Sequence, residues 1–286
     1  MLLHDLHTHS CCSDGLLPPA DVVALAARAG VSHLALTDHD STAGVAEADA
    51  AAAEMGVELI PGVEISVSWN GAVVHIVGLG VAPDHPGLNA GLARLRAHRA
   101  WRGEEMARRL EQQGVTEAYR GAVALAGGPV LARTHFARLL VGQGHAKTLN
   151  DAFRRFLKRG RPAYVAGEWA ALEEAVAWIK AAGGQAVLAH PLRYGFTQAR
   201  LRALLQAFKC CGGVGMEVVS GQPPGGEVST LARLCARFGL LASAGSDFHD
   251  PGAPGQRLGA FPPLPRECRP IWSLWDGAGY RLACRA

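Results

Sequence analysis

The chain has 286 residues, of which 49% are hydrophobic and 19% are charged. This composition excludes disordered, collagen-like and disulfide-scaffold proteins, and the length allows one large domain or two small ones. No apolar run approaches the roughly 18 residues of a transmembrane helix, and the first 30 residues lack an export signal. The seven cysteines form no Cys-x-x-Cys pair. We therefore expect reduced thiols and a cytoplasmic protein with no membrane association and no indicated protein partner.

The net charge of +3 conceals an uneven distribution. Residues 94–161 contain 15 basic and 5 acidic residues, whereas the rest of the chain contains 13 basic and 20 acidic residues. A basic segment therefore interrupts a mildly acidic one. This polarity predicts either an anionic ligand held between the two parts, such as phosphate or nucleic acid, or a solvated helical surface.

Before the basic segment, short β-rich runs alternate with helical runs. Hydrophobic periodicity and capping residues predict strands at 2–6, 33–37 and 57–60, and helices at 18–29 and 44–55. Two further strands, 65–69 and 73–79, flank Asn70-Gly71. This dipeptide is the strongest short signal for a β-hairpin.

The basic segment is predicted to be helical, and its longest helix covers residues 88–113. At about 100° per residue, Arg99 falls near the centre of the apolar stripe of this helix and Arg102 near its edge. Arginines on a buried face must meet acidic partners or an anionic ligand.

After the basic segment the alternation of helix and strand resumes. The pattern predicts helices at 168–182, 197–208 and 227–238, and strands at 186–189, 214–218 and 240–244. Repeated β-α units predict a parallel sheet, either open or closed into a barrel.

Residues that can bind metal ions follow almost every predicted strand. Nine candidates are His7, His9, Asp14, His39, Glu64, His75, His135, Asp247 and His249. The C-terminal ends of parallel strands meet at one face of a barrel, so we expect these side chains to converge. A lone His-x-His is weak evidence for a metal, because a surface pair has the same sequence. The complete set is a strong signal.

Nine ligands exceed what one ion can use, so the sequence predicts two or three divalent metal ions. Imidazole and carboxylate ligands without thiolate suit manganese, with iron or zinc as alternatives. Such ions activate water and neutralise charge on a transferred phosphoryl group. Hydrolysis of a phosphate ester therefore fits both the ligand set and the distribution of charge.

The sequence resembles the PHP family, the polymerase and histidinol phosphatase superfamily of metal-dependent phosphoesterases. The resemblance extends from residue 1 to about residue 250. The matching motifs are Asp5-Leu6-His7-Thr8-His9-Ser10, Ser13-Asp14-Gly15, Thr37-Asp38-His39-Asp40, Pro61-Gly62-Val63-Glu64, His75, His135, Ala189-His190-Pro191 and Ser246-Asp247-Phe248-His249.

This resemblance implies an α/β fold, a distorted (β/α)7 TIM-like barrel with a helical insert. Residues 1–82 and 163–286 would form the barrel, and residues 83–162 the insert. It also implies a division of the nine ligands. His7, His9 and Asp247 would hold one ion, Glu64 would bridge it to a second ion on His75 and His135, and the third ion would lie on Asp14, His39 and His249.

Within the family, the helical insert resembles that of the nucleotide phosphoesterases. Some members of that subgroup remove the 3′-phosphate from nucleoside 3′,5′-bisphosphates, and some trim short RNA from its 5′ end. By this resemblance Arg99 and Arg102 would bind the 5′-phosphate. Arg133 would neutralise the reacting phosphate, while His190 would position that phosphate or protonate the leaving 3′-oxygen.

Other functions remain open from the sequence. A 5′-3′ exonuclease acting on short oligonucleotides would use the same residues, and a histidinol phosphatase would share the metals but would not need the basic insert. An amidohydrolase usually has a lysine that bridges its metals, and none of the four lysines follows a predicted strand. A nucleic-acid-binding module without catalysis would not need nine ligands.

Three further carboxylates have open roles. Glu217 ends a predicted strand, where it could face the site or form a structural ion pair. Asp38 and Asp40 flank His39, where they could orient imidazoles or cap the next helix.

Overall fold

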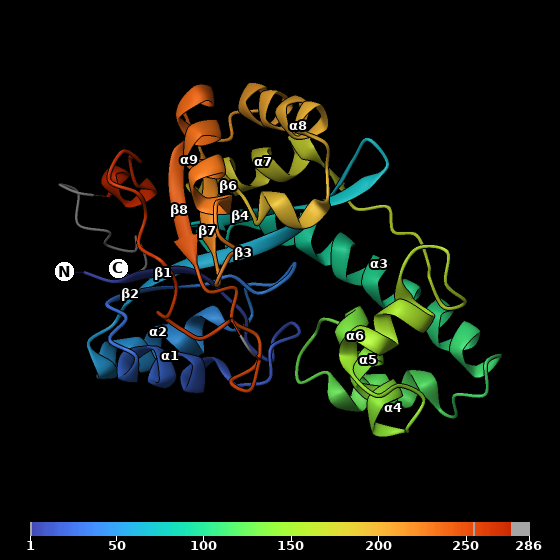
Figure 1. Ribbon diagram of the computed structural model, residues 1–286. Helices are drawn as coiled ribbons and strands as arrows, with labels where there is room; N and C mark the ends of the chain where they lie inside the picture. Colours follow the sequence, from blue (N-terminus) through green and yellow to red (C-terminus); the bar gives the residue numbers. More distant parts are fainter. Residues whose placement is uncertain (1, 254, 276–286) are drawn as a thin grey trace.

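Seven strands form a nearly closed ring in the computed structural model, which describes residues 2–253 and 255–275 (Figure 1). Their order is β1 (His4–Thr8), β2 (His33–Leu36), β3 (Glu58–Trp69), β4 (Ala72–Leu79), β6 (Gln185–Leu188), β7 (Gly215–Ser220) and β8 (Leu241–Gly245). The short strand β5 (Ala170–Ala171) pairs with β3 outside this path. The ring closes where Asp247 N donates to His7 O and His9 N donates to Phe248 O, both at 2.9 Å. The predicted α/β barrel is therefore confirmed.

Only β4 runs against its neighbours in the ring. The predicted hairpin joins it to β3, with Asn70 (φ 45°) and Gly71 (φ 74°) both left-handed as a tight two-residue turn requires. The antiparallel register sets His75 of β4 opposite Ser66 of β3. This reversal brings the first half of β4 to the end of the ring where the parallel strands finish.

Strand β3 is longer than the sequence predicts. The two predicted strands at 57–60 and 65–69 form one continuous strand that passes through Pro61. Proline lacks an N–H donor and so weakens a strand prediction. Here its carbonyl oxygen accepts hydrogen bonds from Gly80 N and Val81 N, so pairing with the chain beyond β4 continues across it.

Five helices cover the outside of the ring: α1 (Pro19–Arg28), α2 (Val45–Met55), α7 (Leu172–Ala181), α8 (Gln198–Cys210) and α9 (Glu227–Phe238). Their apolar faces pack in two clusters, one centred on α1 and α2 and one on α7 to α9. A third cluster, which includes Leu6, Ile60 and Val187, is formed mainly by strand residues. Side chains therefore fill the interior of the ring, as in other closed β/α barrels.

Residues between β4 and β5 form the predicted helical insert. It contains α3 (Pro86–Glu111), α4 (Ala118–Leu125), α5 (Arg133–Gly142), α6 (Leu149–Ala152) and a π-helical turn (Phe153–Leu157). Figure 1 shows α4, α5 and α6 gathered beside the far end of α3, away from the strands. They have their own apolar cluster, to which Met106 and Leu110 of α3 contribute.

Helix α3 contributes to two cores. Its first half, including Leu88 and Leu92, packs with the barrel, whereas its second half belongs to the core of the insert. Arg99 and Arg102 lie between these halves and are each only 7% exposed, so the predicted buried position of both arginines is confirmed. The division of the chain at residues 82/83 and 162/163 stays a prediction.

Two expectations from composition can be compared with the described residues. None of the helices described has the length and apolar character needed to cross a membrane. The six cysteines described are free thiols, and Cys284 lies outside the described residues.

Candidate functional site

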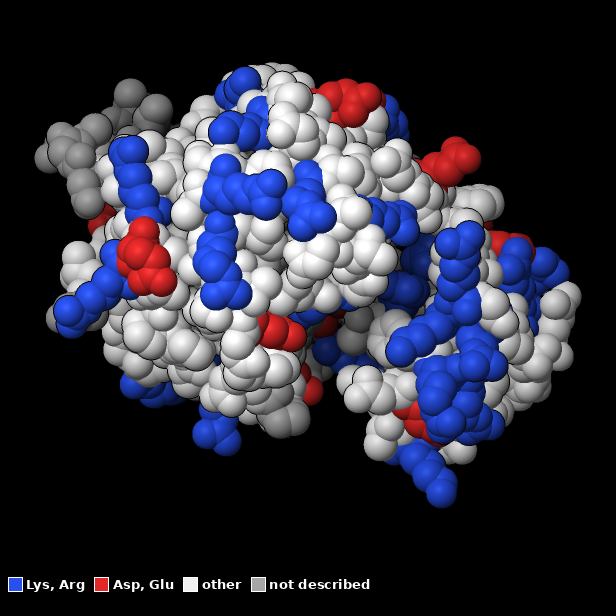
Figure 2. Space-filling model, turned by 45° about the horizontal axis from the view of Figure 1, so that its top comes forward, with Lys and Arg blue, Asp and Glu red and all other residues white. Residues whose placement is uncertain are grey.

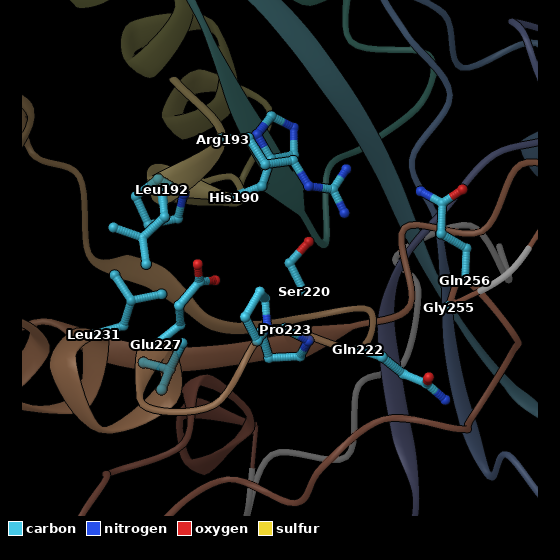
Figure 3. A pocket seen from close by; sticks show the side chains of 13 residues that line it. His190, Leu192, Arg193, Ser220, Gln222, Pro223, Glu227, Leu231, Gly255 and Gln256 are labelled. Carbon is cyan, nitrogen blue, oxygen red and sulfur yellow. The ribbon is translucent and has the colours of Figure 1, made fainter. Parts of the chain in front are cut away.

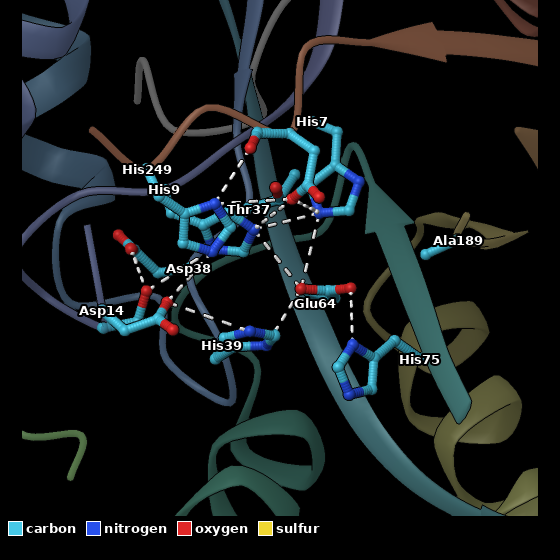
Figure 4. Close-up of polar contacts among 12 residues, drawn as sticks. His7, His9, Asp14, Thr37, Asp38, His39, Glu64, His75, Ala189 and His249 are labelled. Carbon is cyan, nitrogen blue, oxygen red and sulfur yellow. Dashed lines mark hydrogen bonds and ion pairs between the residues drawn. The ribbon is translucent and has the colours of Figure 1, made fainter. Parts of the chain in front are cut away.

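Histidine and carboxylate side chains from around the ring converge on Glu64 (Figure 4). Glu64 lies on β3, His7 on β1 and His75 on β4, and the remaining members follow β1, β2, β6 and β8. We call this set the histidine cluster: His7, His9, Asp14, His39, Glu64, His75, His190, Asp247 and His249. All nine side chains are buried or half-buried. The convergence of these strand ends explains why residues 240 positions apart in sequence are neighbours.

One part of the cluster surrounds a point between His7 and His9. Oε2 of Glu64 lies 3.4 Å from Nε2 of both histidines. Oδ1 of Asp247 lies 3.4 Å from the same two nitrogens. Two imidazole nitrogens and two carboxylate oxygens therefore face one another, which is a suitable donor set for a divalent ion.

The other oxygen of Glu64 contacts two different histidines. Its Oε1 lies 2.9 Å from His75 Nδ1 and 3.0 Å from His190 Nε2. His190 has a left-handed backbone (φ 27°), a strained conformation for a residue other than glycine. Such strain is concentrated at functional sites, where surrounding contacts hold it in place.

His135 does not lie in this group. It is the third residue of α5, and its Nδ1 accepts a hydrogen bond of 3.1 Å from the backbone N–H of Ala132 at the start of that helix. Burial lowers the pKa of His135 to about 4. The geometry thus differs from the division of ligands expected from the sequence, because His190 and not His135 shares Glu64 with His75.

A third part of the cluster lies around Asp14. Its Oδ1 is 3.3 Å from His249 Nε2 and 3.9 Å from His39 Nε2. Asp14, His39, His249 and His9 each place one nitrogen or oxygen atom within 4.8 Å of the corresponding atoms of the other three. The helical insert supports this group, since Thr134 of α5 donates a hydrogen bond of 2.9 Å to Asp14 Oδ2.

The charges within the cluster depend strongly on one another. Burial raises the pKa of Glu64, but the surrounding His39, His75 and His7 outweigh burial and hold it well below its usual range. Burial and the neighbouring His249 lower the pKa of His9 to about 3, so its imidazole is a neutral donor. Burial lowers the pKa of His249, but Asp14 and Asp247 outweigh burial and raise it to about 9. Metal ions bind ionised carboxylates and neutral imidazoles, so a bound ion would replace the proton of this imidazole.

Buried polar atoms of the cluster face one another closely. Glu64 Oε2 lies 2.9 Å from His39 Nδ1, and Asp14 Oδ1 lies 3.3 Å from His249 Nε2. His190 Nδ1 is buried and has no hydrogen-bond partner among the described residues, and such an atom destabilises a fold by roughly 1–3 kcal/mol. This concentration of buried nitrogen and oxygen atoms fits a site for metal ions.

Glu217 of β7 holds two members of the cluster. Its Oε1 lies 2.5 Å from His7 Nδ1, and its Oε2 accepts a hydrogen bond of 2.7 Å from the backbone N–H of His190. Burial lowers the pKa of His7, but Glu217, Glu64 and Asp247 outweigh burial and raise it well above its usual value. A carboxylate behind a metal-binding imidazole fixes the ring orientation. The sequence signal for this role was the place of Glu217 at the end of a strand.

Asp38 and Asp40 have other partners. Asp38 accepts hydrogen bonds from Ser10 and Ser13 and so holds the loop before Asp14. Asp40 accepts one from Ser66 N and pairs with Arg99. In the described part of the chain, no hydrogen bond joins either aspartate to an imidazole.

A cavity of about 160 Å³ lies between the histidine cluster and the insert. Asp14, His39 and His75 line it on the cluster side. The insert side of the cavity is lined by Arg99, Arg102, Arg133, Tyr164 and Trp169. We call this cavity the arginine pocket. Figure 2 shows lysine and arginine side chains gathered over the insert and in the hollow beside the barrel.

The three arginines have different partners. Arg99 Nε donates to Asp40 Oδ2 at 2.7 Å, and its Nη2 donates to Ser66 Oγ at 2.8 Å. Arg102 donates from Nε to the carbonyl oxygen of Val165 at 2.9 Å, and no ion pair with a described carboxylate is found for it. The exposed Arg133 lies with its guanidinium 5.7 Å from the ring centre of Phe153.

Electrostatics in this pocket favour an anion. Burial, together with the positive charges of Arg133 and Arg99, lowers the pKa of Arg102 to about 9. Of these three arginines, only Arg99 forms an ion pair with a carboxylate among the described residues, that of Asp40. Paired N–H donors of arginine bind phosphate oxygens strongly, so a phosphate would satisfy both the charges and the donors.

Residues 5–180 match the model of the PHP domain family. The chain is 47% identical over 269 residues to a 3′,5′-nucleoside bisphosphate phosphatase from Chromobacterium violaceum, with 94% of each chain covered. It is 46% identical to a 5′-3′ exoribonuclease from Haemophilus influenzae, with 87% of this chain and 90% of the relative covered. The fold is also similar to a solved structure described as an amidohydrolase from Chromobacterium violaceum with bound sulfate and no metal. The two structures match with a TM-score of 0.90 at 46% sequence identity, and the match covers 94% of each chain.

Proposed function

The chain belongs to the PHP domain family, and we propose that it is a metal-dependent phosphomonoesterase that removes the 3′-phosphate from nucleoside 3′,5′-bisphosphates. For adenosine 3′,5′-bisphosphate the products are 5′-AMP and phosphate. The relative from Chromobacterium violaceum, named as a phosphatase for this substrate class, supports the proposal along nearly the whole chain.

One observation carries this proposal: a single cavity is lined by both the histidine cluster and the three arginines. A nucleoside 3′,5′-bisphosphate has two phosphates separated by a ribose. One phosphate can lie at the cluster, where it reacts, while Arg99 and Arg102 hold the other. A substrate with one phosphate would leave one of these two sites without a ligand.

The residues present fit two or three divalent ions, with manganese first and iron or zinc as alternatives. Bound ions would supply an activated water and would neutralise charge on the phosphoryl oxygens. We assign His7, His9, Glu64 and Asp247 to one ion, and Glu64, His75 and His190 to a second. Asp14, His39 and His249 would hold the third. This assignment uses His190 in the place that the sequence-based division gave to His135.

The arginines bind and orient the substrate. Arg102 has two terminal nitrogens beyond its bond to Val165, and Arg99 has Nη1 beyond its bonds to Asp40 and Ser66. These donors would hold the 5′-phosphate and so fix the distance between the ribose and the cluster. Arg133, directly before Thr134 and near Asp14, would contact the reacting phosphate and stabilise the negative charge that its oxygens carry.

The alternatives differ in what they require of this pocket. A histidinol phosphatase binds a small cationic amine, which three arginines would repel. An amidohydrolase with a bridging lysine does not fit, because Glu64 bridges the cluster. A 5′-3′ exonuclease is the second candidate, since it breaks the same phosphorus–O3′ bond. It is favoured by the name of the relative from Haemophilus influenzae. A cytoplasmic location is part of the proposal and rests on the sequence.

The proposal is tested by measuring phosphate release from adenosine 3′,5′-bisphosphate, histidinol phosphate and 5′-AMP, and nucleotide release from a short 5′-phosphorylated RNA. Each assay is run with added manganese and with a chelator. We expect phosphate release from the bisphosphate, with 5′-AMP as the other product and loss of activity in chelator. Activity on histidinol phosphate alone, or undiminished activity in chelator, would refute the proposal.

A further inference from the structure

The two carboxylate oxygens of Asp247 face different surroundings. Its Oδ1 lies 3.4 Å from Nε2 of both His7 and His9, within the histidine cluster. Its Oδ2 forms an ion pair with Nη1 of Arg193, and Gln256 Nε2 lies 3.5 Å from the same oxygen. Only Oδ1 is therefore directed at the place of a metal ion, while Oδ2 is already occupied by donors of the protein.

Arg193 and Gln256 reach Asp247 from a cavity beside the cluster. This cavity has a volume of about 480 Å³ and is lined by segments that follow β6, β7 and β8. Figure 3 shows the Arg193 guanidinium and the Gln256 amide pointing toward each other. The side chain of Arg193 is 46% exposed, whereas that of Asp247 is only 3% exposed. Arg193 is therefore not part of the packed core, and its replacement should leave the fold intact.

The backbone fixes both partners of this ion pair. Arg193 belongs to the 3₁₀ turn Pro191–Tyr194. The hydroxyl group of Tyr194 accepts a hydrogen bond of 2.9 Å from the backbone N–H of His75, which ties this turn to β4. Asp247 has a left-handed backbone (φ 53°), and such strained positions persist only where the surrounding structure holds them. The fold itself therefore sets the orientation of the Asp247 carboxylate.

The pairing with an arginine sets Asp247 apart from the other carboxylates of the histidine cluster. Within the described residues, the ion pairs of Glu64 and Asp14 are all with histidines. A histidine can give up its proton when an ion binds, but an arginine keeps its positive charge. Arg193 therefore continues to compete for Oδ2 of Asp247 when an ion lies at Oδ1.

Divalent ions differ in how much they depend on both oxygens of a carboxylate. Calcium takes about six to eight oxygen ligands and often binds both oxygens of one carboxylate. Manganese favours octahedral geometry and does not need a carboxylate that binds through two oxygens. A contact that withholds one oxygen of Asp247 therefore weakens the binding of calcium more than the binding of manganese.

We propose that Arg193 is a positioning residue that makes the ion site at His7 and His9 select manganese over calcium. Because Arg193 holds Oδ2 of Asp247, this carboxylate offers one oxygen to the ion. The inference rests on the proposed metal-dependent function and on the assignment of His7, His9, Glu64 and Asp247 to one ion.

The test measures which ions the protein holds, with no substrate present. Metal-free protein is dialysed against equal, saturating concentrations of manganese and calcium, and both ions are measured per chain by elemental analysis. Arg193→Met removes the contact but keeps an unbranched side chain. Arg193→Gln is a second variant, because its shorter side chain ends in a neutral amide. Arg94→Met is the matched control, since Arg94 is an exposed arginine that pairs with Glu174 outside the cluster.

We expect both Arg193 variants to hold more calcium relative to manganese than the wild-type protein. Loss of a contact behind a metal ligand typically changes metal affinity by about 10–100-fold. Since one of three ions is affected, the ratio of bound calcium to bound manganese should rise by about threefold or more for the whole chain. Loss of the positive charge alone would strengthen the binding of both divalent ions alike and leave this ratio unchanged.

An unchanged ratio in both Arg193 variants would overturn the inference, even if the variants held less of both ions. An equal rise of the ratio in Arg94→Met would overturn it as well, as would a wild-type protein that holds more calcium than manganese. None of these results bears on the proposed function. The proposed function would instead fail if the wild-type protein bound no divalent ion or released no phosphate from the bisphosphate.

Discussion

Thr134 of the helical insert donates a hydrogen bond of 2.9 Å to Oδ2 of Asp14, 120 residues earlier in the chain. Arg138, one turn further along α5, donates to the backbone carbonyl oxygen of the same aspartate. The other carboxylate oxygen of Asp14 faces His39 and His249. The insert thus holds one carboxylate of the histidine cluster in place and also carries the arginines of the arginine pocket. Under the proposed function it would join metal binding to substrate binding.

Replacing Thr134 tests this connection. Thr134→Val keeps the volume of the side chain but removes the donor to Asp14. Loss of such a supporting hydrogen bond typically weakens metal affinity by about 10–100-fold. We expect weaker binding of the ion at Asp14, seen as less metal per chain after dialysis, and lower phosphatase activity. Thr134→Ser, which keeps the hydroxyl group, is the control, and equal metal content in both variants would contradict this role.

The pair His190 and His135 gives a direct test of the ligand assignment. Since His190 Nε2 lies 3.0 Å from Glu64 Oε1, His190→Ala should lose one metal ion per chain. The Nδ1 of His135 is occupied by the N–H of Ala132, so His135→Ala should keep the wild-type metal content. Metal content of the purified variants is measured by elemental analysis. Loss of metal from His135→Ala alone would restore the division of ligands expected from the sequence.

Replacing Arg99 should lower the free energy of unfolding much more than replacing Arg102. Arg99→Met leaves the buried carboxylate of Asp40 without its ion pair, which destabilises a protein by about 3–5 kcal/mol. The side chain of Arg102 donates a hydrogen bond to a backbone carbonyl and lies 5.7 Å from the ring centre of Trp169, and two neighbouring cations repel it. Arg102→Met should therefore lower the free energy of unfolding by no more than about 1 kcal/mol. Urea denaturation of both variants measures the difference, and equal losses of stability would contradict this account.

Arg102 should also distinguish substrates. Loss of a charge-assisted contact to the 5′-phosphate should raise the KM of Arg102→Met for a nucleoside 3′,5′-bisphosphate by about 10–100-fold. The KM for a nucleoside 3′-monophosphate, which lacks that phosphate, should change little. Arg108→Met is the matched control, because Arg108 is an exposed arginine on the same helix that pairs with Glu105. Equal changes in KM for both substrates would show that Arg102 does not bind the 5′-phosphate.

Much of the fold was predictable because local signals agree with the final structure. The predicted helix at 227–238 has the bounds of α9, and the hairpin lies at Asn70-Gly71 as expected. These elements depend on nearest neighbours in sequence: hydrophobic periodicity, glycine after a helix and a two-residue turn. The full length of strand β3 was harder to predict, because it passes through Pro61. A proline interrupts a strand only where a neighbouring strand needs the backbone N–H that proline lacks.

The site shows where sequence information ends. Residue types at strand ends indicated a histidine cluster, but they carried no distances between segments far apart in the chain. Which of His135 and His190 shares Glu64 with His75 depends on how α5 packs against the barrel. The partner of Arg99 is Asp40, 59 residues earlier, and that of His7 is Glu217, 210 residues later. Such pairs become visible only when the ring of strands is closed.

The central claim is that the arginine pocket holds the 5′-phosphate while the histidine cluster hydrolyses the 3′-phosphate. It is tested most directly by hydrolysing adenosine 3′,5′-bisphosphate in water enriched in oxygen-18 and examining the products by phosphorus NMR. The account predicts 5′-AMP without label and inorganic phosphate that carries the label, because water attacks the 3′-phosphorus. Formation of 3′-AMP, or recovery of the label in the nucleotide, would contradict it.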